Sequence, residues 1–364
     1  MNKKMNMPES ITTRLLKKDN FISTVDGKET ALYYLKNKNN LQATLTNYGA
    51  RVVSLLVPDK NGNSTDINVG FNSIFDYINA KDQCYGAVVG RYAGRIDGGK
   101  FSIDGVAYQL TVNDGNNAIH GGNTGFQTRV WDTNQINNQS VQFSYVSADG
   151  EEGYPGKFTI KVIYTLTYND ELKMEFKYSS DKKTIANIIN HNFYNLNGEG
   201  TGEINHHLLQ INSVRFNAIN EDCIPMYIAT VQDTPFDFTN FHTIGERINA
   251  NDLQIKNGTG YDHTYTLDKG VSTKPELVAT AIGDISGIAM EVYTTEPGVH
   301  FYTGNFMQSL HTFKSGVKDD SRTAFCLETQ HYPNSPNNPQ VPSTIKEAGK
   351  KYSSITIHRF FIPQ

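Results

Sequence analysis

The strongest constraint on the fold is a long alternation of apolar and polar side chains in the middle of the chain. Apolar residues occupy every second position from 158 to 168 and again from 172 to 178, with Thr, Lys or Glu at most of the positions between them. A period of two places one face of a strand against a core and the other face in water. Because Asn169, Asp170 and Glu171 form a turn between the two runs, the pattern predicts a β-hairpin.

Shorter alternating runs extend the same pattern along the chain. They cover residues 141–146, 288–293, 355–360 and 101–110, the last with a turn at Asp104-Gly105. Nearly every run ends in Gly, Asn or Asp, which supply the positive φ angles of hairpin turns. Neither a long amphipathic helix, nor a Pro/Ser linker, nor an internal repeat interrupts the series. We therefore predict an all-β fold, a large antiparallel β-sandwich, in one domain over residues 1–364.

Net charge, hydropathy and cysteine content limit the ligands and the cellular compartment that we expect. The net charge is −4 and the basic residues are scattered, so no surface for nucleic acid or an anionic membrane is predicted. No stretch approaches the roughly 18 apolar residues of a membrane-spanning helix, and the basic N-terminus leads into no apolar signal region. The three cysteines form no CxxC pair, which favours a reducing compartment. We expect a cytoplasmic protein, monomer or homodimer, that acts on a small neutral polar molecule.

Two distant segments supply a candidate acid and a candidate base. His191 lies in the polar and aromatic segment 190–196, and Glu328 follows the apolar run 324–327. An imidazolium and a carboxylate together donate and accept protons near neutral pH. A carboxylate beside a buried strand is costly unless it is paired, which singles out Glu328. The pair predicts a proton-shuttling enzyme without a cofactor, although His191 also fits an ordinary hydrogen-bonded strand residue.

Three further residues are candidates for ligand binding. His120 precedes two glycines, which allow the backbone to approach a ligand or to turn sharply. Arg95 carries a forked donor that binds two oxygens at once. Asp262 offers an acceptor suited to a sugar hydroxyl. Each residue also has a purely structural interpretation. His120 fits a surface histidine at a glycine turn, Arg95 fits a solvated side chain, and Asp262 fits a turn followed by a strand.

The sequence offers little for a metal or for a nucleophilic serine. It contains neither an HExxH motif nor a closely spaced carboxylate cluster, and the adjacent His206 and His207 would point to opposite faces of a strand. It also lacks the Gly-x-Ser-x-Gly elbow of the serine hydrolases. We therefore predict no metal site and no cofactor.

Several segments together resemble one enzyme family. In chain order they are 90–96, 117–122, 190–196, 234–238, 260–263, 294–305 and 327–331. Their sequence and order are similar to those of the aldose 1-epimerase (galactose mutarotase) family, and the likeness spans almost the whole chain. The resemblance implies a large antiparallel β-sandwich and an isomerase of carbohydrate metabolism. Such an enzyme interconverts the α and β anomers of free hexoses such as galactose and glucose by opening and reclosing the ring.

The resemblance also implies a role for each candidate residue. Glu328 matches the base that takes the proton from the C1 hydroxyl, and His191 matches the acid that protonates the ring oxygen. Arg95, His120 and Asp262 match residues that hold the oxygens of the sugar.

Three departures from the family pattern lie at positions that the resemblance assigns to contact with sugar hydroxyls. Gly94 stands where Asn is usual, Phe193 where Tyr is frequent, and His300 where Gln is common. All three are assigned here to substrate binding, and they leave the sugar preference open.

Three alternative functions fit the sequence less well. An epimerase for a phosphorylated hexose would need a cationic site that the motifs do not offer. A carbohydrate-binding module would have no use for a matched acid and base. A glycoside hydrolase would need two carboxylates, for which only Glu328 and Asp262 are available.

Overall fold

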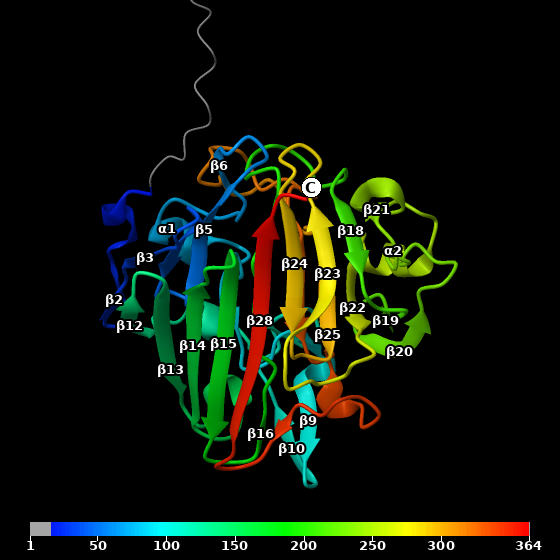
Figure 1. Cartoon of the computed structure of the whole chain (residues 1–364). Helices are drawn as coiled ribbons and strands as arrows, with labels where there is room; N and C mark the ends of the chain where they lie inside the picture. Colours follow the sequence, from blue (N-terminus) through cyan, green and yellow to red (C-terminus); the bar gives the residue numbers. More distant parts are fainter. Residues whose placement is uncertain (1–15, 364) are drawn as a thin grey trace, which may run out of the picture.

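The computed structural model describes residues 16–363, and strands form most of its regular secondary structure (Figure 1). All the strands pair antiparallel, as predicted. The largest sheet has nine strands, in the spatial order β12 (Asp132–Asn137), β13 (Ser140–Ser147), β14 (Phe158–Leu166), β15 (Glu171–Ser180), β28 (Lys351–Phe361), β24 (Ala289–Thr294), β23 (Glu276–Ile282), β18 (Leu208–Ile211) and β21 (His242–Thr243). This sheet therefore draws its strands from both halves of the chain.

The hairpin predicted from the alternating pattern is confirmed. Strands β14 and β15 pair in register, with Val162 opposite Phe176, and the apolar positions of both strands are buried. Asp170 in the connecting turn has a φ of 59°, in the left-handed region that Asp tolerates. The turn at Asp104-Gly105 between β9 (Lys100–Ile103) and β10 (Val106–Gln109) likewise has positive φ at both residues. Local turn chemistry thus sets the register of both hairpins.

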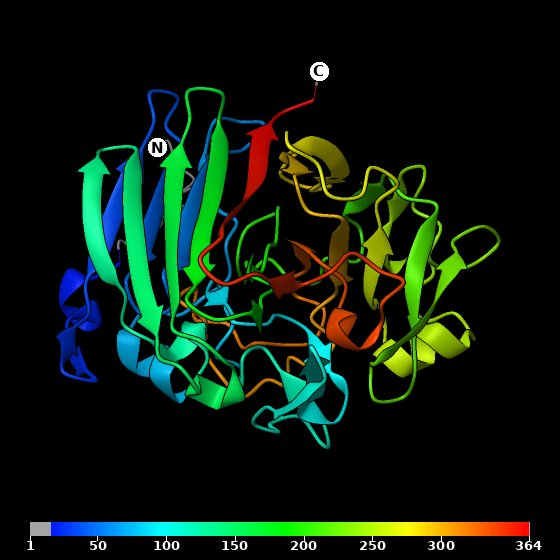
Figure 2. The ribbon, with the colours of Figure 1, turned by 90° about the horizontal axis from the view of Figure 1, so that it is seen from below.

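A second layer covers the inner face of the large sheet (Figure 2). It contains a four-stranded sheet, β3 (Leu32–Lys36), β4 (Gln42–Thr46), β5 (Arg51–Pro58) and β6 (Ser64–Asp66), and a five-stranded sheet in the order β20 (Pro225–Thr230), β19 (Arg215–Ile219), β22 (Asp262–Thr266), β25 (Gly298–Tyr302) and β26 (Cys326–Gln330). Leu45 and Val52 from one layer share a hydrophobic core with Phe143 and Val162 from the other. The predicted β-sandwich is confirmed.

Helices are few and short in the described part of the chain. The two α-helices are α1 (Ile74–Asn79) and α2 (Leu253–Gly258). Each begins at a capping side chain, because Ser73 accepts a hydrogen bond from the Asp76 amide and Asp252 accepts from the amides of Gln254 and Ile255. Six 3₁₀ turns cover Lys18–Phe21, Asp97–Gly99, Phe126–Thr128, Glu151–Gly153, Ile244–Glu246 and Ser335–Asn337. Among residues 16–363, no helix has the length and apolar character needed to cross a bilayer.

Short strand pairs carry polar segments to one side of the five-stranded sheet. In β8 (Arg95–Ile96) and β11 (Ala118–Ile119), Arg95 lies opposite Ile119. In β7 (Val88–Val89) and β17 (Ile189–Asn190), Val88 lies opposite Asn190. The remaining short strands are β1 (Thr24–Val25), β2 (Lys28–Glu29), β16 (Thr184–Ile185) and β27 (Ile345–Lys346). These pairs bring Arg95, His120 and His191 close to strand β26.

Candidate active site

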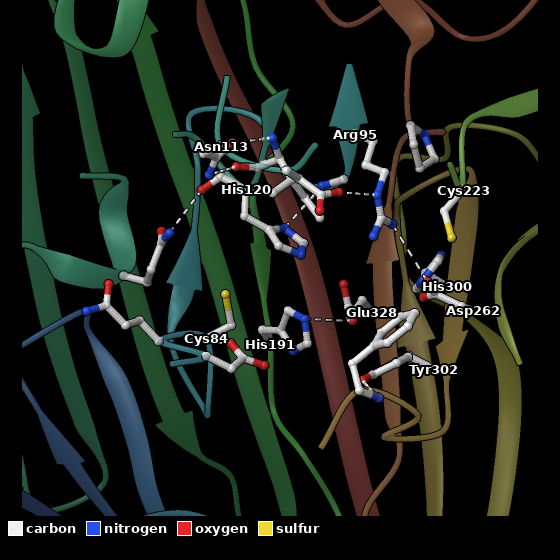
Figure 3. A pocket seen from close by; sticks show the side chains of 18 of the residues that line it. Cys84, Arg95, Asn113, His120, His191, Cys223, Asp262, His300, Tyr302 and Glu328 are labelled. Atoms are coloured by element: carbon white, nitrogen blue, oxygen red, sulfur yellow. Dashed lines mark hydrogen bonds and ion pairs between the residues drawn. The ribbon is translucent and has the colours of Figure 1, made fainter. Parts of the chain in front are cut away.

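A cavity of about 560 Å³ lies beside the five-stranded sheet and gathers most of the predicted site residues. Figure 3 shows Arg95, His120, His191, Asp262, His300 and Glu328 around it, and Gly94 also lines it. They come from loops after β7, β11 and β17 and from strands β8, β22, β25 and β26. Phe193 is absent from the lining. The fold therefore joins segments that lie more than two hundred residues apart in the sequence.

His191 and Glu328 face each other across the cavity floor. The Nε2 atom of His191 lies 3.3 Å from Oε1 of Glu328, and the two residues are only 5% and 3% exposed. Glu328 occupies the centre of β26, a strand buried along its whole length, whereas His191 directly follows β17. The contact is slightly longer than a typical hydrogen bond, as is common for catalytic pairs without a bound substrate. The two groups are thus close enough to exchange protons with the same small molecule.

Packing holds the His191 ring in place on two sides. The Phe193 ring stacks on it at a centroid distance of 4.8 Å and an angle of 18°. Its Nδ1 atom lies 3.6 Å from the Cys326 thiol, which fixes the ring against rotation and leaves Nε2 toward Glu328. Phe193 is completely buried and contacts Tyr85 on its other face. Its position therefore supports orientation of His191 rather than direct contact with a sugar.

His120 occupies a tight turn directly after β11. It has a φ of 52°, and its Nδ1 accepts a hydrogen bond from the Gly94 amide at 3.3 Å. Burial lowers the pKa of His120 well below its ordinary value, and the charges of His191 and Arg95 lower it further, so the ring is neutral near pH 7. A Cβ on Gly121 would lie 1.9 Å from the Gly90 carbonyl oxygen. That glycine is therefore required by a close backbone approach.

Asp262 is a buried carboxylate held between two cationic groups. His300 Nε2 donates a hydrogen bond to Asp262 Oδ1 at 2.8 Å, and Arg95 Nη1 lies 3.7 Å from Oδ2. Burial alone would raise the pKa of Asp262, but the hydrogen bond from His300 and the charges of His300 and Arg95 lower it to about 2. Asp262 is thus ionised at any physiological pH and serves as a hydrogen-bond acceptor.

The guanidinium of Arg95 is already partly engaged. Its Nε donates to Asp114 at 2.7 Å, in addition to the contact with Asp262. The sequence pointed to a fork free to bind two ligand oxygens. In the structure, two carboxylates orient the fork, and its other N–H groups remain for a ligand.

His300 links the two sides of the site. Its Nδ1 shares a hydrogen bond with Thr264 Oγ1 at 2.9 Å, and it stands directly opposite Glu328 in the β25–β26 pair. Burial opposes the charge of this imidazole, but the hydrogen bond and charge of Asp262 outweigh it, and together with Glu328 they raise the pKa of His300. The protonated form of His300, which lies between two carboxylates, is therefore favoured.

Replacing His300 by Gln is expected to make the reaction more sensitive to acid. Without the imidazolium, the pKa of Asp262 rises toward its ordinary value, so Asp262 loses its charge at a higher pH than in the intact protein. The kcat/KM of His300→Gln, measured between about pH 3 and 7, should fall earlier on the acid side. Identical acid limbs for the two proteins would show that His300 does not control Asp262.

Some lining residues carried no signal in the sequence. Cys84 lies in the loop after α1, and Tyr302 ends strand β25 at the cavity wall. Cys84 belongs to a segment without periodicity, and Tyr302 lies in an aromatic strand that reads as ordinary core. Only the contact of these segments in three dimensions places them beside His191.

Comparisons with known proteins agree with this geometry. The family model described as aldose 1-epimerase matches residues 31–359. The chain is 36% identical to galactose mutarotase from Bos taurus over 337 residues, which cover 92% of this chain and 96% of that protein. It is 32% identical to aldose 1-epimerase from Escherichia coli K12 over 346 residues, with the same coverage.

Solved structures show the same likeness. The structure of an aldose epimerase homologue from C. elegans superposes with a TM-score of 0.84 at 26% identity, over 92% of this chain and all of that one. Galactose 1-epimerase from Lactobacillus acidophilus gives a TM-score of 0.81 at 27% identity, over 94% and 97% of the two chains.

Proposed function

The chain belongs to the aldose 1-epimerase family, and we propose that His191 and Glu328 are the acid and base with which it interconverts the anomers of free hexoses. The protein is an isomerase with mutarotase activity on hexoses. The observation that carries the assignment of roles is the 3.3 Å contact between the two groups in the cavity. The ring oxygen and the C1 hydroxyl of a sugar are bonded to the same carbon. An acid and a base that serve both oxygens must therefore lie close together, as these two do.

The reaction follows from one proton transfer at each group. Glu328 takes the proton of the C1 hydroxyl while the N–H of His191 Nε2 protonates the ring oxygen, and the C1–O5 bond breaks to give the open-chain aldehyde. Rotation about C1–C2 presents the other face of the carbonyl. His191 then removes the proton from the C5 hydroxyl as it attacks C1, and Glu328 returns its proton to the carbonyl oxygen. The enzyme ends in its starting state, and the reaction requires no cofactor.

We propose that the other cavity residues hold the hydroxyl groups of the sugar. Ionised Asp262 accepts from a hydroxyl, and Arg95 and His120 provide donors. Gly94 contributes no side chain, and a Cβ there would lie 3.0 Å from Pro333. His300 lies nearby at a position where Gln is common, so charged groups would contact the sugar hydroxyls. These two positions are therefore the ones proposed to set sugar preference, with galactose or glucose as the substrate.

The proposal extends to the cellular setting. Cys84, Cys223 and Cys326 are all free thiols, as a reducing compartment such as the cytoplasm favours. A single domain over residues 1–364 is supported by the nine-stranded sheet, which contains both residue 132 and residue 361. The modest negative charge supports a sugar as the ligand and gives no reason to invoke nucleic acid or a membrane. A monomer or a homodimer is compatible with the proposal.

A sugar panel tests this function. Freshly dissolved α-D-galactose, α-D-glucose and glucose 6-phosphate are each followed by optical rotation with and without the protein. We expect equilibration of at least one free hexose well above the buffer rate, and a weaker effect on the phosphate ester. A selective effect on the phosphate ester would instead support the alternative epimerase, and no effect on either free hexose would overturn the proposal.

A further inference from the structure

One thiol in the cavity has no part in the proposed proton transfers. Cys84 is 6% exposed, and its sulfur points toward the rings of His120 and His191 (Figure 3). One ligand atom from each of these three residues lies within 4.8 Å of the other two. The residues come from three separate segments, the loop after α1 and the turns after β11 and β17. Their convergence is a feature of the fold and not of a local sequence motif.

We propose that Cys84, His120 and His191 form a site for a thiophilic divalent cation such as Zn²⁺, and that the bound ion inhibits the enzyme. One sulfur and two imidazole nitrogens are the donors that Zn²⁺ prefers, whereas Mg²⁺ and Ca²⁺ prefer oxygen. The Glu328 carboxylate lies 3.3 Å from His191 Nε2 but forms a separate cluster with His191 and Cys326, so a water molecule would complete the tetrahedral set. On binding, the Cys84 S–H proton and the Nε2 proton of His191 are both released to solvent, and the thiolate sulfur and the freed Nε2 form bonds to the metal.

The state of the two imidazoles favours coordination. A neutral His120 imidazole has one nitrogen lone pair to offer, and in the free protein Nδ1 uses it to accept from the Gly94 amide. Coordination through Nε2 moves its proton to Nδ1, which costs the long 3.3 Å hydrogen bond from Gly94. When His191 binds the ion through Nε2, its remaining proton is on Nδ1. That N–H faces the Cys326 sulfur at 3.6 Å, and this contact supports the orientation of the ring. The three ligand atoms lie within 4.8 Å of one another, so binding requires the side chains to move closer to the ion.

Inhibition follows from the position of the ion. It would occupy Nε2 of His191 and the space beside Glu328, the same atoms that must donate and accept the protons of the sugar. Metal and sugar therefore compete for one place, and saturating sugar protects the enzyme. The ion is proposed as an inhibitor and not as a cofactor, because the proposed reaction needs the N–H of His191 Nε2.

The test uses the whole protein, Zn²⁺ as inhibitor and Co²⁺ as a spectroscopic probe. Zn²⁺ should slow mutarotation, with reversal by a chelator and competition by sugar, while Mg²⁺ has no effect. Co²⁺ should give the visible absorption of a tetrahedral site and a thiolate charge-transfer band. Cys84→Ser should keep its metal-free activity, lose the charge-transfer band, and require at least about 10-fold more Zn²⁺ for the same inhibition.

Two matched variants identify the thiol. Cys223→Ser removes the thiol that lines the cavity on the side of Arg95 and Asp262, and it should respond to both metals as the intact protein does. Cys326→Ser tests the second thiol beside His191. Unchanged Zn²⁺ inhibition in Cys84→Ser, or loss of the band only in Cys326→Ser, would overturn the assignment. The rates without metal test the proposed mutarotase function, and the response to Zn²⁺ and Co²⁺ tests the metal site. Failure of the metal site is therefore distinguishable from failure of the proposed function.

Discussion

Replacing Glu328 by Gln is expected to lower the kcat for hexose mutarotation by about 10²–10⁴-fold, the scale of losing one general base. The amide has the size of the carboxylate, but it cannot take the proton of the C1 hydroxyl. Because the residues proposed to hold the sugar, Asp262, Arg95, His120 and His300, are unchanged in this variant, KM should change much less than kcat. The measurement is the initial rate of change in optical rotation at several sugar concentrations.

A second carboxylate on a strand provides the control for Glu328→Gln. Glu291 lies on β24, accepts a hydrogen bond from Tyr293 and does not line the cavity. Glu291→Gln should therefore retain the rate of the intact protein. A Glu328→Gln variant that is folded and has nearly full activity would show that another group removes the proton.

Replacing Lys314 by Met is expected to destabilise the protein by about 3–5 kcal/mol, the cost of leaving a buried charge without its partner. Lys314 is 9% exposed and contacts the carboxylate of Glu199, which is 6% exposed, while Asp66 lies 3.4 Å away. Glu199 also accepts from the amides of Gly70 and Ser315, so it cannot turn toward solvent. The free energy of unfolding in urea, or the Tm, measures the effect.

Two further variants separate the buried charge from other causes. Lys318→Met removes an exposed lysine of the same loop and should change stability by less than about 0.5 kcal/mol. Combining Lys314→Met with Glu199→Gln removes both charges and should recover part of the loss. Equal stability of Lys314→Met and the intact protein would mean that Glu199 is not ionised in the folded state.

The local parts of the fold were accessible from the sequence, and the long-range parts were not. The β14–β15 hairpin follows from period-two alternation and a turn of Asn and Asp, both of which act within a few residues. The pairing of β15 with β28 joins residues 171–179 to residues 351–359. No local pattern specifies that neighbour, because any strand with the same alternation would bury the same face.

The site residues also fall into those that local sequence indicates and those that only long-range contacts bring together. The short polar and aromatic segment 190–196 points to His191, and Glu328 stands out because a carboxylate beside an apolar run is costly unless it is paired. Phe193 was assigned to the sugar, but the structure places it behind His191, since alternation along a strand does not tell which face borders the cavity. The ion pair of Lys314 and Glu199 spans 115 residues and left no trace in the sequence. Cys84 was counted as one of three unpaired thiols, and its neighbours appear only in the folded chain.

The central claim is that His191 and Glu328 act together on one sugar, and one set of rates tests it most directly. Optical rotation of fresh α-D-galactose and α-D-glucose is followed with the intact protein, His191→Asn, Glu328→Gln and the double variant. Groups that act in one transition state lose their effects non-additively. The account predicts that each single variant loses most of the acceleration and that the double variant is about as slow as the slower single. A folded single variant with the rate of the intact protein, or losses that multiply in the double variant, would contradict it.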